Sequence, residues 1–126
     1  NLRGRTVGIL GLTFKPNTDD MRDAPSLDII RFLQDQGATV RAFDPEGMAS
    51  AKQMLEDVTF ASDAYDAASK ADALVIVTEW DAFRALDFAR LKGEMTSPVL
   101  VDLRNIYDPA DVERHGFAYH SVGRRS

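Results

Sequence analysis

The sequence contains no cysteine, and this absence removes several kinds of chemistry. Without thiols the chain can form no disulfide framework, no thiolate metal site and no cysteine nucleophile. It also has no apolar run near the ~20 residues that span a bilayer, and no signal-peptide pattern opens it. Because lack of disulfides is typical of reducing compartments, we expect a cytoplasmic protein with no membrane partner.

Basic residues are in the minority. The 126 residues include 15 Lys and Arg against 20 Asp and Glu, which gives a formal net charge of −5. Bulk charge therefore argues against binding to nucleic acid or an anionic membrane, although a local basic site for a phosphorylated ligand remains possible. The length is typical of one domain. Because the chain opens with Asn1 and soon reaches an apolar run, we expect residues 1–126 to be one domain of a longer protein.

Apolar and amphipathic segments alternate along the whole chain. Strands are predicted at 6–12, 39–45, 58–62 (a strand or an extended link), 72–80, 97–104 and 117–123 (an edge strand). Helices are predicted between them, and the segment 81–95 can break near Asp87. For the first helix, Asp23 or Ser26 can cap the start, Pro25 suits the first turn and Gly37 ends it.

The central strands are almost continuously apolar, which is typical of a parallel sheet covered on both faces. With right-handed crossovers, this predicts an α/β fold of three layers, Rossmann-like and doubly wound, with a mainly parallel sheet. Ligands of such sheets bind at the carboxyl ends of the strands. Charged residues gather in three segments at those ends: "GLTFKPNTDDMRDAPS", "TEWD" and "DLRNIYDP".

The glycines of the first strand do not form a dinucleotide fingerprint. Gly8 and Gly11 are not followed by the G-x-G-x-x-G spacing that brings backbone amides to a pyrophosphate, and Lys15 and Pro16 occupy the loop instead. Asp44 ends the second strand, where an acid that binds a ribose would lie. Without the glycines, a turn or capping role is the favoured interpretation of Asp44.

Three cations in these loops allow two interpretations each. Lys15 and Arg22 are either solvated loop charges or anion ligands, since lysine binds phosphate as a point charge and arginine can bind two oxygens. Arg104 directly follows a buried strand. It is either a ligand of this kind or the partner of Asp102 or Asp108 in a salt bridge.

Other chemistry-bearing residues favour structural roles. The histidines are too isolated for a metal pair or a catalytic dyad, and Trp80 favours packing over base stacking. The first loop's aspartates could suggest a cation site, but ion pairs or helix capping are the favoured interpretation. Those aspartates are Asp19, Asp20 and Asp23, and their possible partners are Arg3, Arg5 and Arg22.

Three longer motifs carry a resemblance to a known family. "GILGLTFKPNTDDMRDAPS", "VIVTEWDAF" and "VDLRNIYDP", in this order, resemble signatures of the C-terminal domain of the UDP-glucose/GDP-mannose dehydrogenases. The resemblance covers essentially the whole chain, and the first motif is the most specific. "FKPNTDDMR" with "TEWDAF" is most similar to the bacterial UDP-glucose branch, and the GDP-mannose branch is the alternative.

The resemblance implies a division of labour between domains. Enzymes of this family have an N-terminal Rossmann domain for NAD, a central helical domain that makes dimers, and a C-terminal domain for the UDP part of the substrate. They oxidise the sugar C6 alcohol to a carboxylate in two NAD-dependent steps through a cysteine thioester. By this resemblance, NAD is held mainly outside this chain and the catalytic cysteine lies upstream. The isolated chain should contain no catalytic residue and be inactive.

The resemblance also assigns roles to individual residues. It implies that Phe14, Lys15 and Arg104 bind substrate, with Arg104 on the UDP moiety. Arg22 would reach NAD held by the other domain. Lys15 and Arg104 are expected from adjacent strand ends, with Asp20 and Asp23 orienting the cations, and no residue is expected to bind metal.

Three alternatives stay open at this point. The chain could be the same domain of a GDP-mannose or other UDP-sugar 6-dehydrogenase. It could be a non-catalytic Rossmann-like module whose charged loops bind protein. It could also be an independent dinucleotide-binding dehydrogenase domain, which the missing glycine fingerprint argues against.

Overall fold

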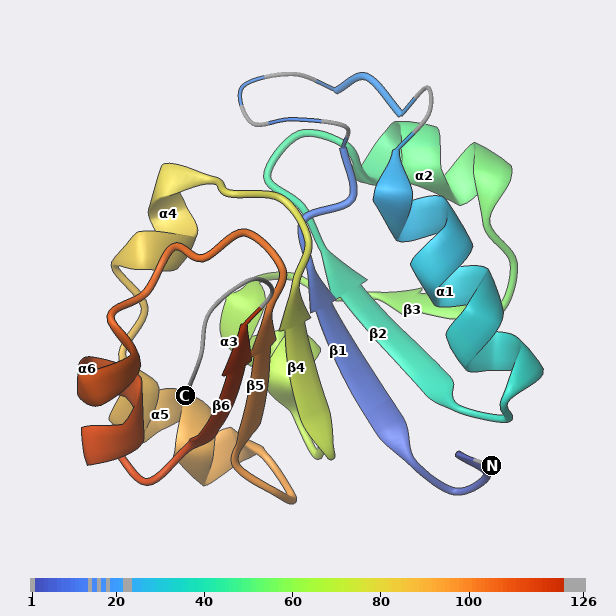
Figure 1. Cartoon of the computed structure of the whole chain (residues 1–126). Helices are drawn as coiled ribbons and strands as arrows, with labels where there is room; N and C mark the ends of the chain where they lie inside the picture. The colour runs from blue at the N-terminus through green and yellow to red at the C-terminus, as the bar shows by residue number, and fades with distance from the viewer. Residues whose placement is uncertain (1, 14, 16, 18, 22–23, 122–126) are drawn as a thin grey trace.

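A computed structural model describes residues 2–13, 15, 17, 19–21 and 24–121, and these form a three-layer α/β structure (Figure 1). Six strands of the described residues make one sheet in the order β3-β2-β1-β4-β5-β6, and each neighbouring pair is parallel. The strands are β1 (Thr6–Leu10), β2 (Thr39–Phe43), β3 (Val58–Phe60), β4 (Ala73–Ile76), β5 (Val99–Asp102) and β6 (Ala118–Ser121). The helices are α1 (Pro25–Asp35), α2 (Met48–Met54), α3 (Ala64–Ala68), α4 (Asp81–Arg84), α5 (Phe88–Glu94) and α6 (Pro109–Arg114).

The strand order confirms the doubly wound topology. The chain starts in the middle of the sheet at β1, moves outward through β2 to β3, then returns beside β1 as β4 and moves outward again. The topological switch therefore lies between β1 and β4, where ligands of such folds bind. The uncertain segment 58–62 contains β3, and β6 is an edge strand as predicted.

Two hydrophobic cores lie on opposite faces of the sheet. Successive strand residues point to opposite faces, so Ile9 and Leu10, both fully buried, belong to different cores. Ile9 packs with residues of α1 and α2, whereas Leu10 packs with residues of the remaining helices. In Figure 1 α1 and α2 lie to the right of β1 and β2, with α1 in front of β3, and α3 lies behind the sheet. This arrangement explains why the central strands are apolar on both sides.

The start of α1 differs in part from the prediction. Pro25 occupies the first turn, as expected, and the N-cap is Ala24, whose side chain makes no capping hydrogen bond. The hydroxyl of Ser26 donates instead to the carbonyl oxygen of Leu12, at 2.6 Å, so its predicted capping role is wrong. Ser26 is fully buried, and a buried hydroxyl is stabilised by any good acceptor, here at the end of β1. Asp23 lies outside the described residues.

Two other predicted boundaries are confirmed. Gly37 follows the C-cap of α1 with a φ of +96°, a conformation that glycine adopts at low cost. The segment 81–95 is divided into α4 and α5, and the carboxylate of Asp87 accepts a hydrogen bond from the amide of Arg90 at the start of α5. None of the helices in the described residues has the length and apolar character that crossing a membrane requires.

Candidate functional site at the carboxyl ends of the strands

The β1 loop is fixed to β4 by a close backbone contact. Gly11 has a φ of +94°, and a Cβ at this position would lie 2.5 Å from the amide nitrogen of Thr78. The Thr78 hydroxyl then donates to the carbonyl oxygen of Thr13, at 2.7 Å. Gly8 is equally enclosed, since a Cβ there would lie 2.6 Å from the carbonyl oxygen of Ala67. Both glycines thus serve internal packing and offer no open backbone cradle to a dinucleotide.

Asp44 joins three loops from a buried position. Its Oδ2 accepts hydrogen bonds from the amides of Leu12 and Thr13, at 2.7 and 3.1 Å, and from Nε1 of Trp80, at 3.1 Å. Its Oδ1 accepts from the amides of Glu46–Gly47, at 2.9 and 2.7 Å. The turn role predicted for Asp44 is confirmed. Trp80 is 7% exposed, so its predicted packing role is confirmed as well.

Lys15 lies on the surface of the β1 loop. The hydroxyl of buried Thr13 donates to the carbonyl oxygen of Lys15, at 3.0 Å, which fixes the local backbone while the Lys15 side chain is exposed. Phe14 and Arg22 lie outside the described residues, so their roles stay predictions. Arg5, considered above as a partner for the loop aspartates, pairs with Asp72 at 3.5 Å.

The β5 loop is wrapped around a second buried carboxylate. Asp102 accepts hydrogen bonds from the amides of Arg104, Ile106 and Tyr107, at 3.0, 2.8 and 3.3 Å. The hydroxyl of Tyr119 on β6 donates to the same carboxylate, at 2.7 Å. These bonds hold the backbone of the loop in place and do not involve the Arg104 side chain, which is partly exposed.

Tyr107 fixes the far side of this loop. Its hydroxyl donates to the carbonyl oxygen of Phe83 in α4. Burial, with the nearby Asp102 carboxylate as a smaller contribution, raises the pKa of Tyr107 well above its usual range. Tyr107 therefore stays a neutral donor at ordinary pH and ties the β5 loop to α4.

Arg104 is paired with a residue that the sequence analysis did not select. Its Nε lies 2.6 Å from Oε2 of Glu79, and the two side chains are 44% and 24% exposed. The predicted partners, Asp102 and Asp108, are wrong, because each carboxylate is engaged with backbone amides: Asp102 as above, and Asp108 with Ala110 at the start of α6, at 3.1 Å. Glu79 follows β4, which lies beside β5, and that topology is the signal that could have identified it.

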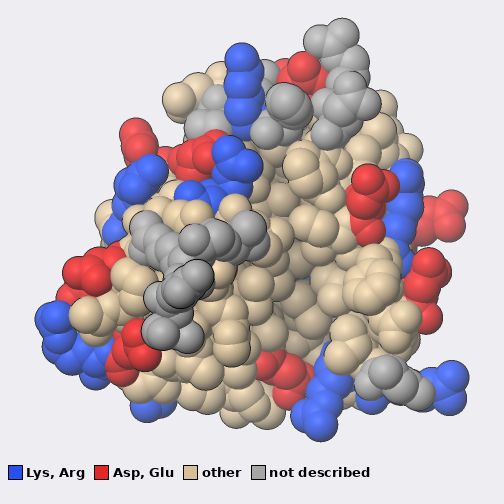
Figure 2. Space-filling model, in the orientation of Figure 1, with Lys and Arg blue, Asp and Glu red and all other residues tan. Residues whose placement is uncertain are grey.

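The expected adjacency of Lys15 and Arg104 is also wrong. They follow β1 and β5, and β4 lies between these strands in the sheet. Along this edge, Lys15 follows β1 and Arg104 follows β5. The carboxylate of Glu79 follows β4, the strand between them. Figure 2 shows basic and acidic side chains close together on the upper part of the molecule, with uncharged surface in the middle of the face.

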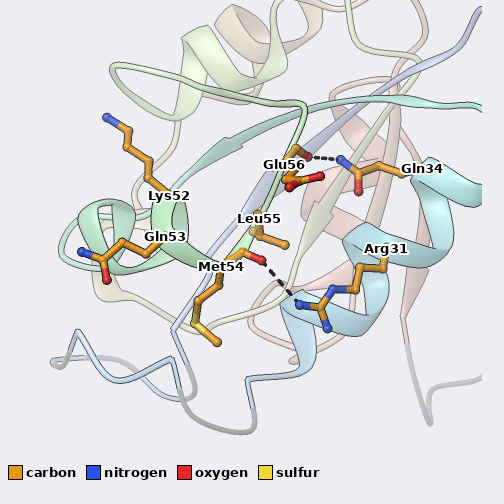
Figure 3. Close-up of a pocket in the computed structure, with 7 residues that line it drawn as sticks. All are labelled: Arg31, Gln34, Lys52, Gln53, Met54, Leu55 and Glu56. Carbon is orange, nitrogen blue, oxygen red and sulfur yellow. Dashed lines mark hydrogen bonds between the residues drawn. The ribbon is translucent and has the colours of Figure 1, made fainter.

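Neither of two surface pockets offers a phosphate site at this edge, one because of its composition and the other because of its position. One, of about 460 Å³, lies beside the loops of β1, β2 and β4 and is lined by Asn17, Asp19, Glu46 and Trp80. Its two carboxylates would repel an anion. The other, of about 450 Å³, lies between α1 and the end of α2, beside the start of β3 (Figure 3). Hydrogen bonds from Arg31 to the carbonyl oxygen of Met54 and from Gln34 to that of Glu56 join the lining residues of α1 to those that end and follow α2.

The remaining titratable residues form no obvious metal centre. Among the residues that the structure describes, no group of three His, Asp or Glu side chains is placed to hold a metal ion. His115 lies at the end of α6, with Nδ1 2.8 Å from the carbonyl oxygen of Asp111. The charged side chains at the strand ends therefore include Lys15, Arg104 and Glu79, besides Asp19 and Glu46 of the pocket.

Comparison with known proteins identifies the family of the chain. A sequence profile of the UDP-glucose/GDP-mannose dehydrogenase family, UDP binding domain, matches residues 8–109. The chain belongs to this family. It is 57% identical to the UDP-glucose 6-dehydrogenase of Rhizobium meliloti over 124 residues, and this match covers 98% of this chain and 28% of the relative. It is 41% identical to the UDP-glucose 6-dehydrogenase TuaD of Bacillus subtilis, over 98% of this chain and 27% of the relative.

Solved structures of the family have the same fold. A UDP-glucose dehydrogenase from Pyrobaculum islandicum is 33% identical with a TM-score of 0.81, over 98% of this chain and 26% of that one. An NDP-N-acetyl-D-galactosaminuronic acid dehydrogenase from Methanosarcina mazei is 27% identical with a TM-score of 0.85, with the same coverage of 98% and 26%. The chain thus spans between a quarter and a third of its relatives' length.

Proposed function

We propose that this chain binds the UDP part of a nucleotide sugar, with Arg104 as a ligand of the UDP moiety. The observation that carries the proposal is Arg104 itself. Its backbone is fixed by Asp102 and its guanidinium is partly exposed at the carboxyl end of β5, in a chain of the family's UDP binding domain. A fixed, accessible guanidinium is the group that recognises pairs of phosphate oxygens.

Lys15 and Phe14 complete the proposed substrate contacts. The exposed ammonium of Lys15 would contact the diphosphate as a point charge from the β1 side. Phe14, in the same loop, would pack against the substrate, and Arg22 would reach NAD held by another domain. The two cations approach across the end of β4, so the proposed site is spread over three strand ends.

We place the chemistry itself outside this chain. The proposed parent protein is a UDP-glucose 6-dehydrogenase that oxidises UDP-glucose to UDP-glucuronate with two NAD. Gly8 and Gly11 are enclosed, so the residues present do not fit a dinucleotide cradle, and we assign NAD mainly to an N-terminal domain of the parent. We further propose that the parent has a central domain and forms a homodimer or larger oligomer. Its proposed location is the cytoplasm, where UDP-sugars and NAD are available.

The sugar is assigned from the relatives rather than from the site. UDP-glucose 6-dehydrogenases are 57%, 41% and 45% identical to this chain in Rhizobium meliloti, Bacillus subtilis and Pseudomonas aeruginosa. A UDP-D-ManNAc dehydrogenase from Pyrococcus horikoshii is 26% identical, with a TM-score of 0.77. This difference supports UDP-glucose over other nucleotide sugars.

Calorimetric titration of the purified chain with UDP, GDP and NAD tests the proposal. We expect UDP to bind and GDP to bind more weakly, with NAD giving no heat of binding. NADH formation from UDP-glucose should be absent with this chain alone and present with the parent protein. Absence of UDP binding by both proteins would contradict the proposal and favour a protein-interaction module. Preference for GDP would move the chain to the GDP-mannose branch.

A further inference from the structure

Glu79 and Arg104 form a close ion pair at the ends of two adjacent strands. The distance from Arg104 Nε to Glu79 Oε2 is 2.6 Å, slightly shorter than the ~2.7–2.9 Å that is usual for a charge-assisted N–H···O hydrogen bond. β4 and β5 are paired in register as far as Ile76 and Asp102, so the two loops leave the sheet side by side. The order of the strands in the sheet thus brings Glu79 and Arg104 together.

The backbone on both sides of Glu79 is fixed. Thr78 donates its hydroxyl to the carbonyl oxygen of Thr13, at 2.7 Å, and Trp80 donates Nε1 to buried Asp44, at 3.1 Å. Glu79 lies between these two anchored residues, so the backbone position from which its side chain extends is fixed. The backbone of both members of the pair is therefore fixed. Glu79 is held by its two neighbours, and Arg104 by the hydrogen bond from its amide to Asp102.

The choice of nitrogen matters for what Arg104 can still bind. A guanidinium is planar and carries five N–H donors, of which Nε supplies one. Within the described residues, Glu79 contacts the guanidinium through Nε. A carboxylate there restrains the rotation of the plane and leaves the two terminal nitrogens for a bidentate contact with phosphate oxygens.

We infer that Glu79 is a positioning residue, which holds the Arg104 guanidinium by Nε and directs its terminal nitrogens at the diphosphate of the bound UDP moiety. This rests on the proposed function. Ordering a flexible arginine before binding removes part of the entropy that binding would otherwise cost, so a positioned Arg104 binds more tightly than a mobile one.

The charge of Glu79 acts in the opposite direction. A carboxylate near a diphosphate repels it, and this repulsion alone would make UDP bind more tightly once Glu79 is removed. Positioning predicts weaker binding for the same change. The two effects therefore differ in sign, and the affinity of a Glu79 variant distinguishes them.

The experiment measures UDP binding by calorimetry for Glu79→Ala, Glu79→Gln and Arg104→Ala in this chain. Glu79→Ala should weaken UDP binding about 5- to 10-fold, the scale of one lost charge-assisted contact in a partly exposed site. Glu79→Gln keeps an oxygen acceptor for Nε, so its affinity should stay within about threefold of the wild type. Asp81→Ala is the matched control, because it removes a carboxylate two positions away whose side chain is 99% exposed, and it should bind as the wild type does.

Two further measurements separate positioning from a general structural effect. In an Arg104→Ala background, Glu79→Ala should no longer weaken UDP binding, because nothing remains to be positioned and only the repulsion is lost. The Nε–Hε NMR signal of Arg104 should be sharp in the wild type and broadened by exchange in Glu79→Ala. In the parent protein, Glu79→Ala should raise the KM for UDP-glucose and leave kcat nearly unchanged.

The outcomes also separate this inference from the proposed function. If Arg104→Ala binds UDP as the wild type does, the role proposed for Arg104 and this inference are both wrong. If Arg104→Ala weakens binding but Glu79→Ala does not, or tightens it, only the positioning role is overturned. Urea unfolding of each variant shows whether it is folded. Should Glu79→Ala fail to fold, Glu79→Leu gives the same decision, because it also removes the acceptor for Nε: weaker UDP binding supports positioning, and unchanged or tighter binding overturns it.

Discussion

Trp80 Nε1 donates a hydrogen bond to Asp44 Oδ2 at 3.1 Å, and this bond connects the end of β4 to the end of β2. β1 lies between those two strands, so the bond passes over the end of β1. The same Oδ2 also accepts from the amides of Leu12 and Thr13, which continue β1. One buried carboxylate therefore determines where the loops of three strands leave the sheet.

Asp44→Ala should destabilise the chain strongly. Five N–H groups, four of them in buried hydrogen bonds, would lose their acceptor. We expect a loss of about 3–5 kcal/mol in the free energy of unfolding, since water can satisfy only some of them. Trp80→Phe removes one of those bonds and should cost less, about 1–2 kcal/mol. Urea unfolding measures both. A loss below about 1 kcal/mol for Asp44→Ala would show that the carboxylate is dispensable.

Gly11→Ala should destabilise the chain, whereas Gly93→Ala should not. Gly11 combines a φ of +94° with a Cβ position 2.5 Å from the backbone of Thr78. We expect Gly11→Ala to cost about 2–4 kcal/mol, from strain and displacement of the β4 loop. Gly93 lies in α5, and a Cβ there meets no atom within 4 Å. Its replacement by alanine should be neutral or stabilise the helix by up to about 1 kcal/mol. Thermal or urea unfolding of the pair gives the comparison, and equal effects would contradict it.

The fold was largely predictable because its signals are local. Four strongly apolar segments predicted the central strands correctly, and Asp87 indicated the break between two helices. Ser26 shows where local signals fail. It is the right residue type for a cap at the right position, but the end of β1 offers its hydroxyl a better acceptor, Leu12, which is distant in sequence.

The site was less predictable because it depends on which strands are neighbours. The carboxylate nearest to Arg104 in sequence is Asp102, but its oxygens are used by the loop backbone. Glu79 becomes the partner only because β4 lies beside β5, 25 residues away in sequence. The same strand order separates Lys15 from Arg104. Sequence patterns identify strands well, but they do not specify strand order without further argument.

Stability in acid should depend on Asp66. The backbone amide of Ser62 donates to its carboxylate at 2.9 Å and Arg41 at 2.8 Å, and these contacts, the Ser62 amide foremost, lower the pKa of Asp66. A carboxylate with a lowered folded pKa stabilises the fold above its unfolded pKa, about 4, and loses that contribution as pH falls through the folded pKa. The stability difference between wild type and Asp66→Asn should therefore shrink from pH 6 to about pH 3 in urea unfolding. A difference that is constant or grows toward acid would contradict this.

Arg104→Ala should separate stability from binding. The side chain is 44% exposed and pairs with a partly exposed Glu79, so its removal should cost only about 0–1 kcal/mol of unfolding free energy. UDP affinity should fall by about 1.5–3 kcal/mol, or roughly 10- to 150-fold, the scale of a hydrogen bond to a charged group. NAD affinity of the parent protein should change little, because the proposed cofactor contact is Arg22.

Arg114→Ala is the control for this prediction. Arg114 also pairs with a carboxylate, that of Asp111 at 2.9 Å, but it is 69% exposed on α6 and outside the proposed site. Its removal takes away the same charge from the same chain, so it should leave UDP affinity unchanged. If both arginine variants weaken binding equally, the effect comes from net charge and not from a contact. If Arg104→Ala instead loses about 3–5 kcal/mol of stability with unchanged affinity, the Glu79 pair is a structural ion pair and the UDP ligand must be sought elsewhere along the strand ends.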